Sequence, residues 1–408
     1  MKLLKEVLEG IKPTKTEEKE VKGMIKEFVD KLNKGLKEGK AVLGGSGAKE
    51  TWLSDVHDAD IFVQYDYNKY KDKSDKLSDI LEKRLKKIFP KIKRLHGSRD
   101  YFQVHKKNFT FEIVPILKIT NSKNAINITD VSPLHAVWVG KHKKYADEIR
   151  LTKKFCKAIG VYGAESYIKG FSGYMCEILT IKYKGFLGLV RNASKWGEKT
   201  VIDIEKYYRN KQDVLFNINK SKQQGPMILI DPVQKDRNAA AALDEKKYSH
   251  FIDYCKHFVK KPSKKYFEIK ELDVDRLKGT VLKVEVLRGK EDVVGSKVLK
   301  VVTFLNKELL KKDFKVKGYG WHWDKGKFAY LWYDVDSKKL DSFVVKQGPP
   351  IKIENHAKKF KKMYRNSKVV KGRLIAKVKR EFRDANLLLK KLIKEKYVKE
   401  RVKKISFS

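Results

Sequence analysis

One stretch of the chain, GGSGAKETWLSDVHDAD at 44–60, limits the fold more than any other feature of the sequence. It places a Gly-Gly-Ser turn before an Asp-x-Asp pair, and the segment DADIFVQY at 58–65 reads as a strand. Side chains alternate between the two faces of a strand, so Asp58 and Asp60 point the same way while Ile61 and Val63 can enter a core. The stretch therefore predicts a sheet that carries two carboxylates side by side.

A third acid lies in FTFEIVP at 109–115. In a strand Glu112 faces away from Phe111 and Ile113, and an acid within so apolar a strand is costly unless it is liganded. Neighbouring carboxylates repel one another unless a cation lies between them. Mg²⁺ prefers hard oxygen ligands. Three such acids predict two magnesium ions that bring a 3′-hydroxyl in line with an α-phosphate.

The glycine turn suits the same chemistry, because its backbone N–H groups and the Ser46 hydroxyl can approach a triphosphate closely. Each feature alone has a simpler explanation: a solvated strand start, an edge-strand glutamate and an ordinary turn. Their combination in this order favours a catalytic site. We interpret His57, next to the acids, as a loop residue.

Charge indicates the partner. The chain has 94 Lys and Arg against 51 Asp and Glu, a formal charge of +43 spread along its length. This favours a long polyanion such as nucleic acid, with lysine-rich solvated faces as the alternative. Three separated cysteines exclude a disulfide framework or zinc ribbon and fit a reducing cytoplasm. No apolar run is long enough for a signal peptide or a membrane span, so we expect a soluble cytoplasmic protein.

Periodicity divides the chain into three parts, which we place at 1–142, 143–260 and 261–408. The first has a helix from Thr14, with Glu17 placed for a capping box, then strands, a second helix and two more strands. The second is mainly helical and ends at a linker, KKPSKKY at 260–266. The third predicts a strand–helix–strand–strand unit and a basic helical tail from Ile351.

These motifs make the chain resemble the archaeal, class I CCA-adding enzymes of the polymerase-β nucleotidyltransferase superfamily. The resemblance rests on GGSGAKETW, DADIFV, FEIVP, SPLHAVWV, GVYGAES, GFSGYMCE and DPVQKDRN, and more weakly on QGPPIKIENHAKKF. It implies an α+β multidomain fold: a nucleotidyltransferase head with a small mixed sheet, a helical central domain that selects the nucleotide, and a C-terminal α/β RNA-binding module with a helical tail. It also implies Mg²⁺-dependent, template-independent addition of C, C and A to tRNA from CTP and ATP, with release of pyrophosphate.

The resemblance assigns Asp58, Asp60 and Glu112 as catalytic, metal-binding acids. It implies that the nucleotide is contacted by Gly45, Ser46, Lys49, His135, Lys153 and Tyr162, and that Arg237 reads the base edge. A guanidinium suits that task because its rigid fork can hydrogen-bond a base. Two positions depart from the family pattern: Lys49 stands where Arg is usual and Glu112 where Asp is usual.

The expected partner is tRNA, bound at its 3′ end, acceptor stem and upper arm, and a homodimer stays open. In GYGWHWDKGKFAYLWY at 318–333 we expect about two of every three rings in a core, with the lysines contacting phosphates. A poly(A) polymerase or oligoadenylate synthetase shares the fold and the acids. A non-catalytic RNA-binding protein and a basic ribonucleoprotein scaffold are the remaining alternatives.

Overall fold

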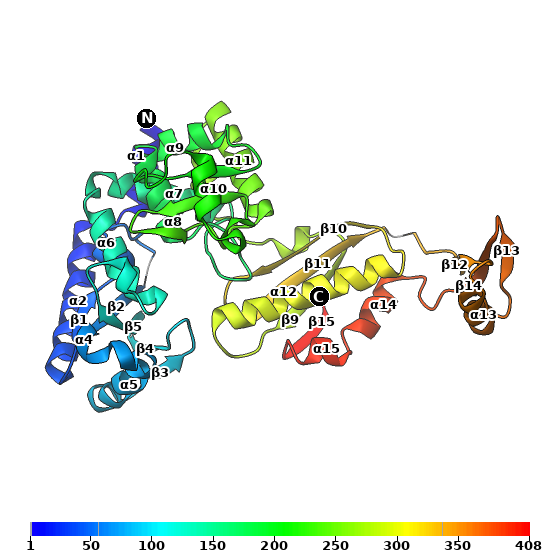
Figure 1. Cartoon of the computed structure of the whole chain (residues 1–408), viewed down its shortest axis with the longest axis horizontal. Coiled ribbons are helices and arrows are strands. Elements are labelled where there is room, and N and C mark those ends of the chain that lie inside the picture. The colour runs from blue at the N-terminus through cyan, green and yellow to red at the C-terminus, as the bar shows by residue number, and fades with distance from the viewer. Residues whose placement is uncertain (1, 56, 337) are drawn as a thin grey trace. The chain divides into compact units, whose positions relative to one another are not determined.

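The computed structural model describes residues 2–55, 57–336 and 338–408, and Figure 1 shows the whole chain. The chain forms two compact units, Met1–Lys270 and Glu271–Ser408. Both combine helices with small sheets, so the predicted α+β multidomain class is confirmed.

In the first unit, a long helix precedes the five-stranded sheet that carries Asp58, Asp60 and Glu112. Helix α2 (Lys15–Gly35) starts at Thr14 with the predicted capping box, because Thr14 and Glu17 each accept a hydrogen bond from the other's backbone N–H. The sheet has the order β1-β2-β5-β4-β3, and its only parallel pair is β2 with β5 in this described part of the chain. Its elements are β1 (Lys40–Leu43), α3 (Gly45–Ala48), β2 (Asp58–Asp66), α5 (Leu77–Ile88), β3 (Lys93–Leu95), β4 (Tyr101–Lys106) and β5 (Phe109–Lys118).

One face of that sheet is the core of the head. Ile61 and Val63 of β2 pack with Phe111 of β5 against Leu32 of α2 and Leu81 of α5. All five side chains are completely buried. The alternation expected from the sequence is therefore confirmed, and the acids of β2 lie on the other face.

The region after the head is helical, as expected, but it also contains strands that we did not expect. Its helices are α6 (Ser132–Gly140), α7 (Ala146–Ala158), α8 (Gly173–Lys182), α9 (Phe186–Ala193), α10 (Lys211–Asn217) and α11 (Glu245–Lys260). A three-stranded sheet joins them: β6 (Thr200–Ile202), β7 (Met227–Asp231) and β8 (Gln234–Asn238). All of β7 is buried, and a short, wholly apolar run cannot be told from a buried helix by its periodicity.

Two more segments pack into this helical core. Helix α1 (Lys2–Ile11), which the sequence analysis missed, buries Leu4, Val7 and Ile11 there. The segment we interpreted as a linker leads into a 3-10 helix, Lys264–Phe267, whose Phe267 is also buried in that core.

The second unit contains the predicted strand–helix–strand–strand, as β9 (Thr280–Glu285), α12 (Glu291–Lys311), β10 (Val316–Trp323) and β11 (Phe328–Val335). The tail from Ile351 contains helices, as predicted, but it also contains strands that we did not predict. From residue 343 the chain alternates β12 (Phe343–Pro350), α13 (Glu354–Met363), β13 (Lys368–Val370), β14 (Arg373–Lys379), α14 (Ala385–Leu392), α15 (Lys396–Lys399) and β15 (Lys404–Phe407). The last strand pairs with β9, a long-range contact that no local pattern announces. Among the described helices, none combines the length and apolarity needed to cross a membrane.

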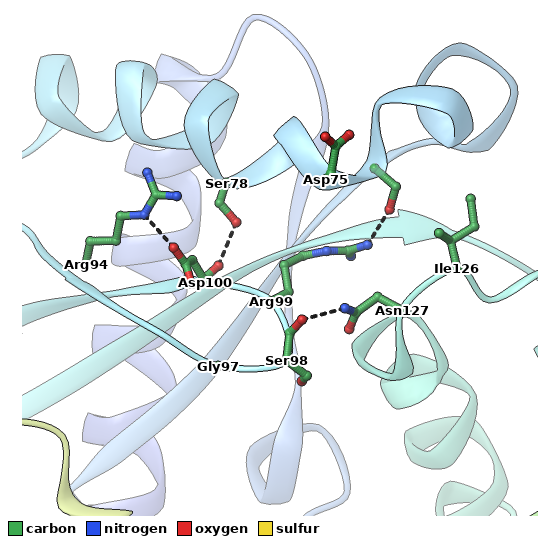
Figure 2. A pocket seen from close by; sticks show the side chains of 10 residues that line it. Asp75, Ser78, Arg94, Gly97, Ser98, Arg99, Asp100, Ile126 and Asn127 are labelled. Atoms are coloured by element: carbon green, nitrogen blue, oxygen red, sulfur yellow. Dashed lines mark hydrogen bonds and ion pairs between the residues drawn. The ribbon is translucent and has the colours of Figure 1, made fainter. Parts of the chain in front are cut away.

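A buried ion pair fixes the edge of the head. Arg99, in the loop between β3 and β4, donates to Asp130 at 2.5 Å, to the carbonyl of Pro115 at 3.0 Å and to Ser74 at 2.6 Å. The Arg99 and Asp130 side chains are 6% and 0% exposed. Figure 2 shows Arg99 reaching across a hollow of about 420 Å³ that this loop helps to line.

We expect Arg99→Ala to lower the free energy of unfolding of the first unit by about 3–5 kcal/mol, because Asp130 would stay buried without its partner. Calorimetric melting would show a drop of several degrees. The control is Lys106→Gln, which breaks an exposed pair with Glu27 and should cost less than about 1 kcal/mol. Equal stability of the two variants would contradict a structural role for Arg99.

Candidate active site

The three acids meet on neighbouring strands of the head sheet. Strand pairing sets Asp60 directly beside Glu112 and Asp58 beside Thr110. Asp60 is half-buried while Asp58, at the start of β2, is exposed. Burial, together with the charges of Glu112 and Asp58, raises the pKa of Asp60 to about 6, against the opposing effect of Lys49. The fold thus concentrates negative charge around the Asp60 carboxylate.

The glycine turn touches this carboxylate. Gly45 has a φ of +53°, and a Cβ at this position would lie 1.6 Å from Oδ2 of Asp60. The N–H of Gly44 donates to the Asp60 carbonyl at 2.7 Å. Gly45 is therefore required by both its backbone conformation and its closeness to Asp60. Ser46 follows it in the short helix α3, next to the acids.

The three acids have the chemistry to bind a cation, but their side chains do not converge on a single point. Within 2–55, 57–336 and 338–408, no three His, Cys, Asp or Glu side chains are grouped tightly enough to hold a metal ion. Glu112 is turned in part toward β4, where its Oε1 accepts a hydrogen bond from Gln103 at 2.7 Å. Crowded carboxylates with hard oxygen donors fit Mg²⁺, because its charge would relieve their repulsion.

A second cluster places two lysines around one buried glutamate. Glu177 of α8 pairs with Lys49 and with Lys153 of α7, each at 2.8 Å. Thr51 donates to Glu177 at 3.0 Å and accepts from Lys153 at 2.8 Å. Burial alone would raise the pKa of Glu177, but the two lysines outweigh it and lower the pKa to about 2. Burial lowers the pKa of Lys153, which Glu177 opposes.

A third cluster surrounds another buried carboxylate, Asp231 at the end of β7. His135 Nε2 lies 3.0 Å from Oδ2 of Asp231, and Arg237 donates to the same oxygen at 2.5 Å. Tyr174 donates to Oδ1 at 3.0 Å and stacks on the His135 ring, with centroids 4.0 Å apart. Burial lowers the pKa of His135, although Asp231 acts to raise it.

Tyr174 joins the two clusters. The ammonium of Lys49 lies 5.0 Å from the centre of the Tyr174 ring. A row of contacts thus runs from Glu177 through Lys49 and Tyr174 to Asp231 and Arg237, and the charge of Lys49 acts on Asp60. Tyr162 lies beside it: a Cβ on Gly173, at the start of α8, would be 2.9 Å from the Tyr162 hydroxyl.

The structure therefore brings together the residues singled out from the sequence, which come from distant segments. Sequence reasoning missed Glu177, Asp231, Tyr174 and Thr51, which bind their neighbours in the row. A signal existed for two of them, since Glu177 interrupts the apolar helix GYMCEILTIK and Asp231 ends the apolar strand MILID. A charge in such a setting is costly unless it is paired.

Three family models match the chain. They describe a nucleotidyltransferase domain at 23–130, the second domain of tRNA nucleotidyltransferase at 147–268, and the C-terminal domain of CCA-adding enzymes at 287–405.

Curated relatives match over most of their length. A CCA-adding enzyme of Nanoarchaeum equitans is 37% identical over 325 residues, covering 79% of this chain and 80% of the relative. CCA-adding enzymes of Methanocaldococcus jannaschii and Methanococcus maripaludis are 30% and 31% identical, covering 93% and 97% of this chain and 88% and 92% of theirs.

Solved structures show the fold at greater distance. A cytoplasmic RNA terminal U-transferase superposes with a TM-score of 0.51 at 14% identity, covering 66% of this chain and 98% of its own. The Cid1 poly(U) polymerase gives 0.52 at 15% identity with the same coverage. At such low identity these similarities show a shared fold and nothing finer.

We expect Glu177→Gln to lower the free energy of unfolding of the first unit by about 3–5 kcal/mol near pH 7, because Lys49 and Lys153 would lose their buried partner. The lost attraction would depress the pKa of Lys153 further. A depressed lysine pKa makes folding less favourable as the pH falls, so the deficit should shrink as the pH is raised toward 9.

Thr51→Val is the matched control, because it removes one hydroxyl and leaves both ion pairs. It should cost about 1 kcal/mol with little dependence on pH. A Glu177→Gln deficit that stayed constant from pH 6 to 9 would refute the role of Glu177 in keeping Lys153 charged.

Proposed function

The chain belongs to the family of archaeal CCA-adding enzymes, and from this premise we propose that Asp58, Asp60 and Glu112 bind two magnesium ions at its active site. The protein is a tRNA nucleotidyltransferase that adds C, C and A to the 3′ end of tRNA without a nucleic-acid template. Enzymes with this domain use Mg²⁺. The observation that carries the proposal is the placement of Asp58 and Glu112 beside Asp60, whose burial, together with the charges of those two acids, raises its pKa to about 6.

Magnesium bound there would supply charge that favours the attacking 3′-hydroxyl and the leaving pyrophosphate. The chain's own contribution is position. Parallel pairing of β2 with β5 sets Asp60 beside Glu112, and the core beneath them fixes both backbones. Asp58, at the exposed end of β2, is accessible to an ion that arrives with its substrate.

Lysine side chains and backbone N–H groups close to the acids could bind a triphosphate. We assign Lys49, Lys153, Gly45 and Ser46 to it. Both lysines pair with Glu177, which supplies the counter-charge to these nearly buried ammonium groups. A triphosphate would add negative charge to a site where two cations share one carboxylate.

Base selection is assigned to the cluster at Asp231. Arg237 is 28% exposed, whereas the Asp231 that orients it is fully buried. A guanidinium fixed at one end and open at the other can present its donors to a base edge. His135 and Tyr162 line the same row and are assigned to the phosphates and sugar.

The substrate partners are tRNA and nucleoside triphosphates, and the finer assignments are proposals. We propose CTP and ATP as the nucleotides, and contacts with the acceptor stem and upper arm of tRNA through residues 261–408. The division at 1–142, 143–260 and 261–408, a cytoplasmic location and a homodimer are further proposals. A poly(A) polymerase or oligoadenylate synthetase is not favoured, because the central and C-terminal family matches are to tRNA-specific and CCA-adding enzymes.

The function is tested with tRNA transcripts that end before CCA, after C and after CC. With Mg²⁺ and labelled CTP or ATP, we expect C, C and then A to be added and addition to stop there. Asp58→Ala and Asp60→Ala should each reduce incorporation by more than about 100-fold, since even outer-shell changes at metal sites cost 10- to 100-fold. Long A tails on unstructured RNA would contradict the proposal.

Magnesium binding is tested separately by stability. The pKa of Asp60 is higher in the folded protein than in the unfolded chain, so the metal-free protein loses stability as the pH rises through about 4 to 6. At pH 7.5 we expect Asp60→Asn to stabilise the metal-free protein by on the order of 1–2 kcal/mol, after a discount for partial exposure. Millimolar Mg²⁺ should raise the melting temperature of the wild type.

Asp66→Asn is the control, because Asp66 is an exposed acid at the far end of the same strand. It should leave the response to Mg²⁺ intact, whereas Asp60→Asn should abolish most of it. An equal Mg²⁺ response in all three proteins would show that Asp60 does not bind the ion.

A further inference from the structure

The four-stranded sheet of the second unit has two different faces. Its order is β10-β11-β9-β15, and Figure 1 shows α12 lying along one side of it. On that side Leu282, Leu331 and Tyr333 are completely buried against Val298 and Val302 of α12. Trp321 and Trp323 of β10 pack against the same core. This covered face accounts for the inward rings of the segment at 318–333.

The opposite face carries three other rings of this segment, whereas Tyr319 stacks on Tyr333 on the covered side. Phe328, Tyr330 and Trp332 alternate along β11 with the buried residues Ala329 and Leu331, so all three point away from α12. All three are partly exposed. None belongs to the hydrophobic core of the described residues 271–336 and 338–408. We call these three side chains the aromatic face.

Two glycines of β10, Gly318 and Gly320, lie near the aromatic face. Gly320 is paired with Trp332, and a Cβ at Gly320 would lie 2.4 Å from the indole ring. The ring therefore lies close over the backbone of β10 at Gly320. A Cβ at Gly318, two residues before Gly320 on β10, would meet nothing within 4 Å, so the space beside Gly318 is open. A partly exposed ring over a glycine of the neighbouring strand gives a planar ligand an accessible surface.

The surroundings are basic. Lys283, directly across from Tyr330, lies 4.4 Å from the centre of the Phe328 ring and 5.9 Å from that of Tyr330. Lys327 lies 5.2 Å from Phe328. Lys403 and Lys327 surround Glu285, the acid at this end of β9. Aromatic rings bordered by lysines match a ligand that combines planar bases with phosphates.

We propose that the aromatic face is a stacking surface for unpaired bases of the RNA substrate. The inference rests on the proposed function, in that tRNA is the RNA concerned, and adds a contact on the second unit that is separate from the catalytic acids. Stacking needs only ring faces, so this contact tolerates sequence differences among RNAs. The lysines hold the phosphates that flank the stacked bases.

The test measures binding of the full-length protein to tRNA that lacks CCA, by fluorescence anisotropy at several salt concentrations. Trp332→Leu should weaken binding by about 10- to 100-fold, the range expected for losing a stacked base. Trp332→Phe keeps a ring and should bind within about threefold of the wild type. The salt dependence should be unchanged in both variants, because neither removes a charge.

Lys283→Gln is the complementary variant. It should reduce the slope of log affinity against log salt by about 0.7–0.9, as expected for one phosphate contact. A blunt RNA duplex without unpaired nucleotides should bind wild type and Trp332→Leu equally. Equal losses on tRNA and duplex, or no loss on either, would overturn the proposal.

Kinetics separate this proposal from the function itself. Trp332→Leu should raise the KM for tRNA while leaving the KM for CTP and the kcat at saturating tRNA unchanged. A wild-type protein that binds tRNA through Trp332 but incorporates no CMP would defeat the function and leave the aromatic face intact. If Trp332→Leu instead converts a dimer into a monomer in gel filtration without altering RNA binding, the face is a protein interface and the proposal is wrong.

Discussion

Repulsion among carboxylates on adjacent strands is the constraint on which the first unit depends. Parallel pairing of β2 and β5 places Asp60 beside Glu112, and burial together with the charges of Glu112 and Asp58 raises the pKa of Asp60. The arrangement is tolerable because the other face is a fully apolar core. It also exposes one acid, Asp58, to solvent. Because the apolar core on one face stabilises the sheet, the other face can carry carboxylates that are available to bind a cation.

The basic side chains near these acids are held in place by two other carboxylates, Glu177 and Asp231. Lys49 and Lys153 share Glu177, and His135 and Arg237 share Asp231. Each carboxylate is buried and comes from the helical region that packs beside the head. Such pairing holds the charged groups in position, because a flexible side chain loses less freedom on binding when it is already oriented.

Local rules predicted the parts of the site that local structure determines. Alternation along β2 and β5 predicted that the acids share a face, and the capping box predicted where α2 begins. The same rules could not predict Glu177 or Asp231, since each meets partners that are distant in the chain: 128 residues separate Lys49 from Glu177, and 96 separate His135 from Asp231. They also missed β7, which is too short and too apolar to distinguish, and β15, whose pairing with β9 is long-range.

Lys49 and Glu112, where the resemblance led us to expect Arg and Asp, each have a local physical explanation. Glu112, longer than aspartate by one methylene, reaches Gln103 on β4 at 2.7 Å, so its extra length is taken up by a partner across the strand. Lys49 must contact Glu177 at 2.8 Å and lie over the Tyr174 ring at once. A compact ammonium on a flexible stem can satisfy both, whereas a planar guanidinium would need a flat, two-pronged partner that Glu177 cannot fully offer while it also binds Lys153. Position 49 therefore favours lysine over arginine, because Lys153 occupies the other oxygen of Glu177.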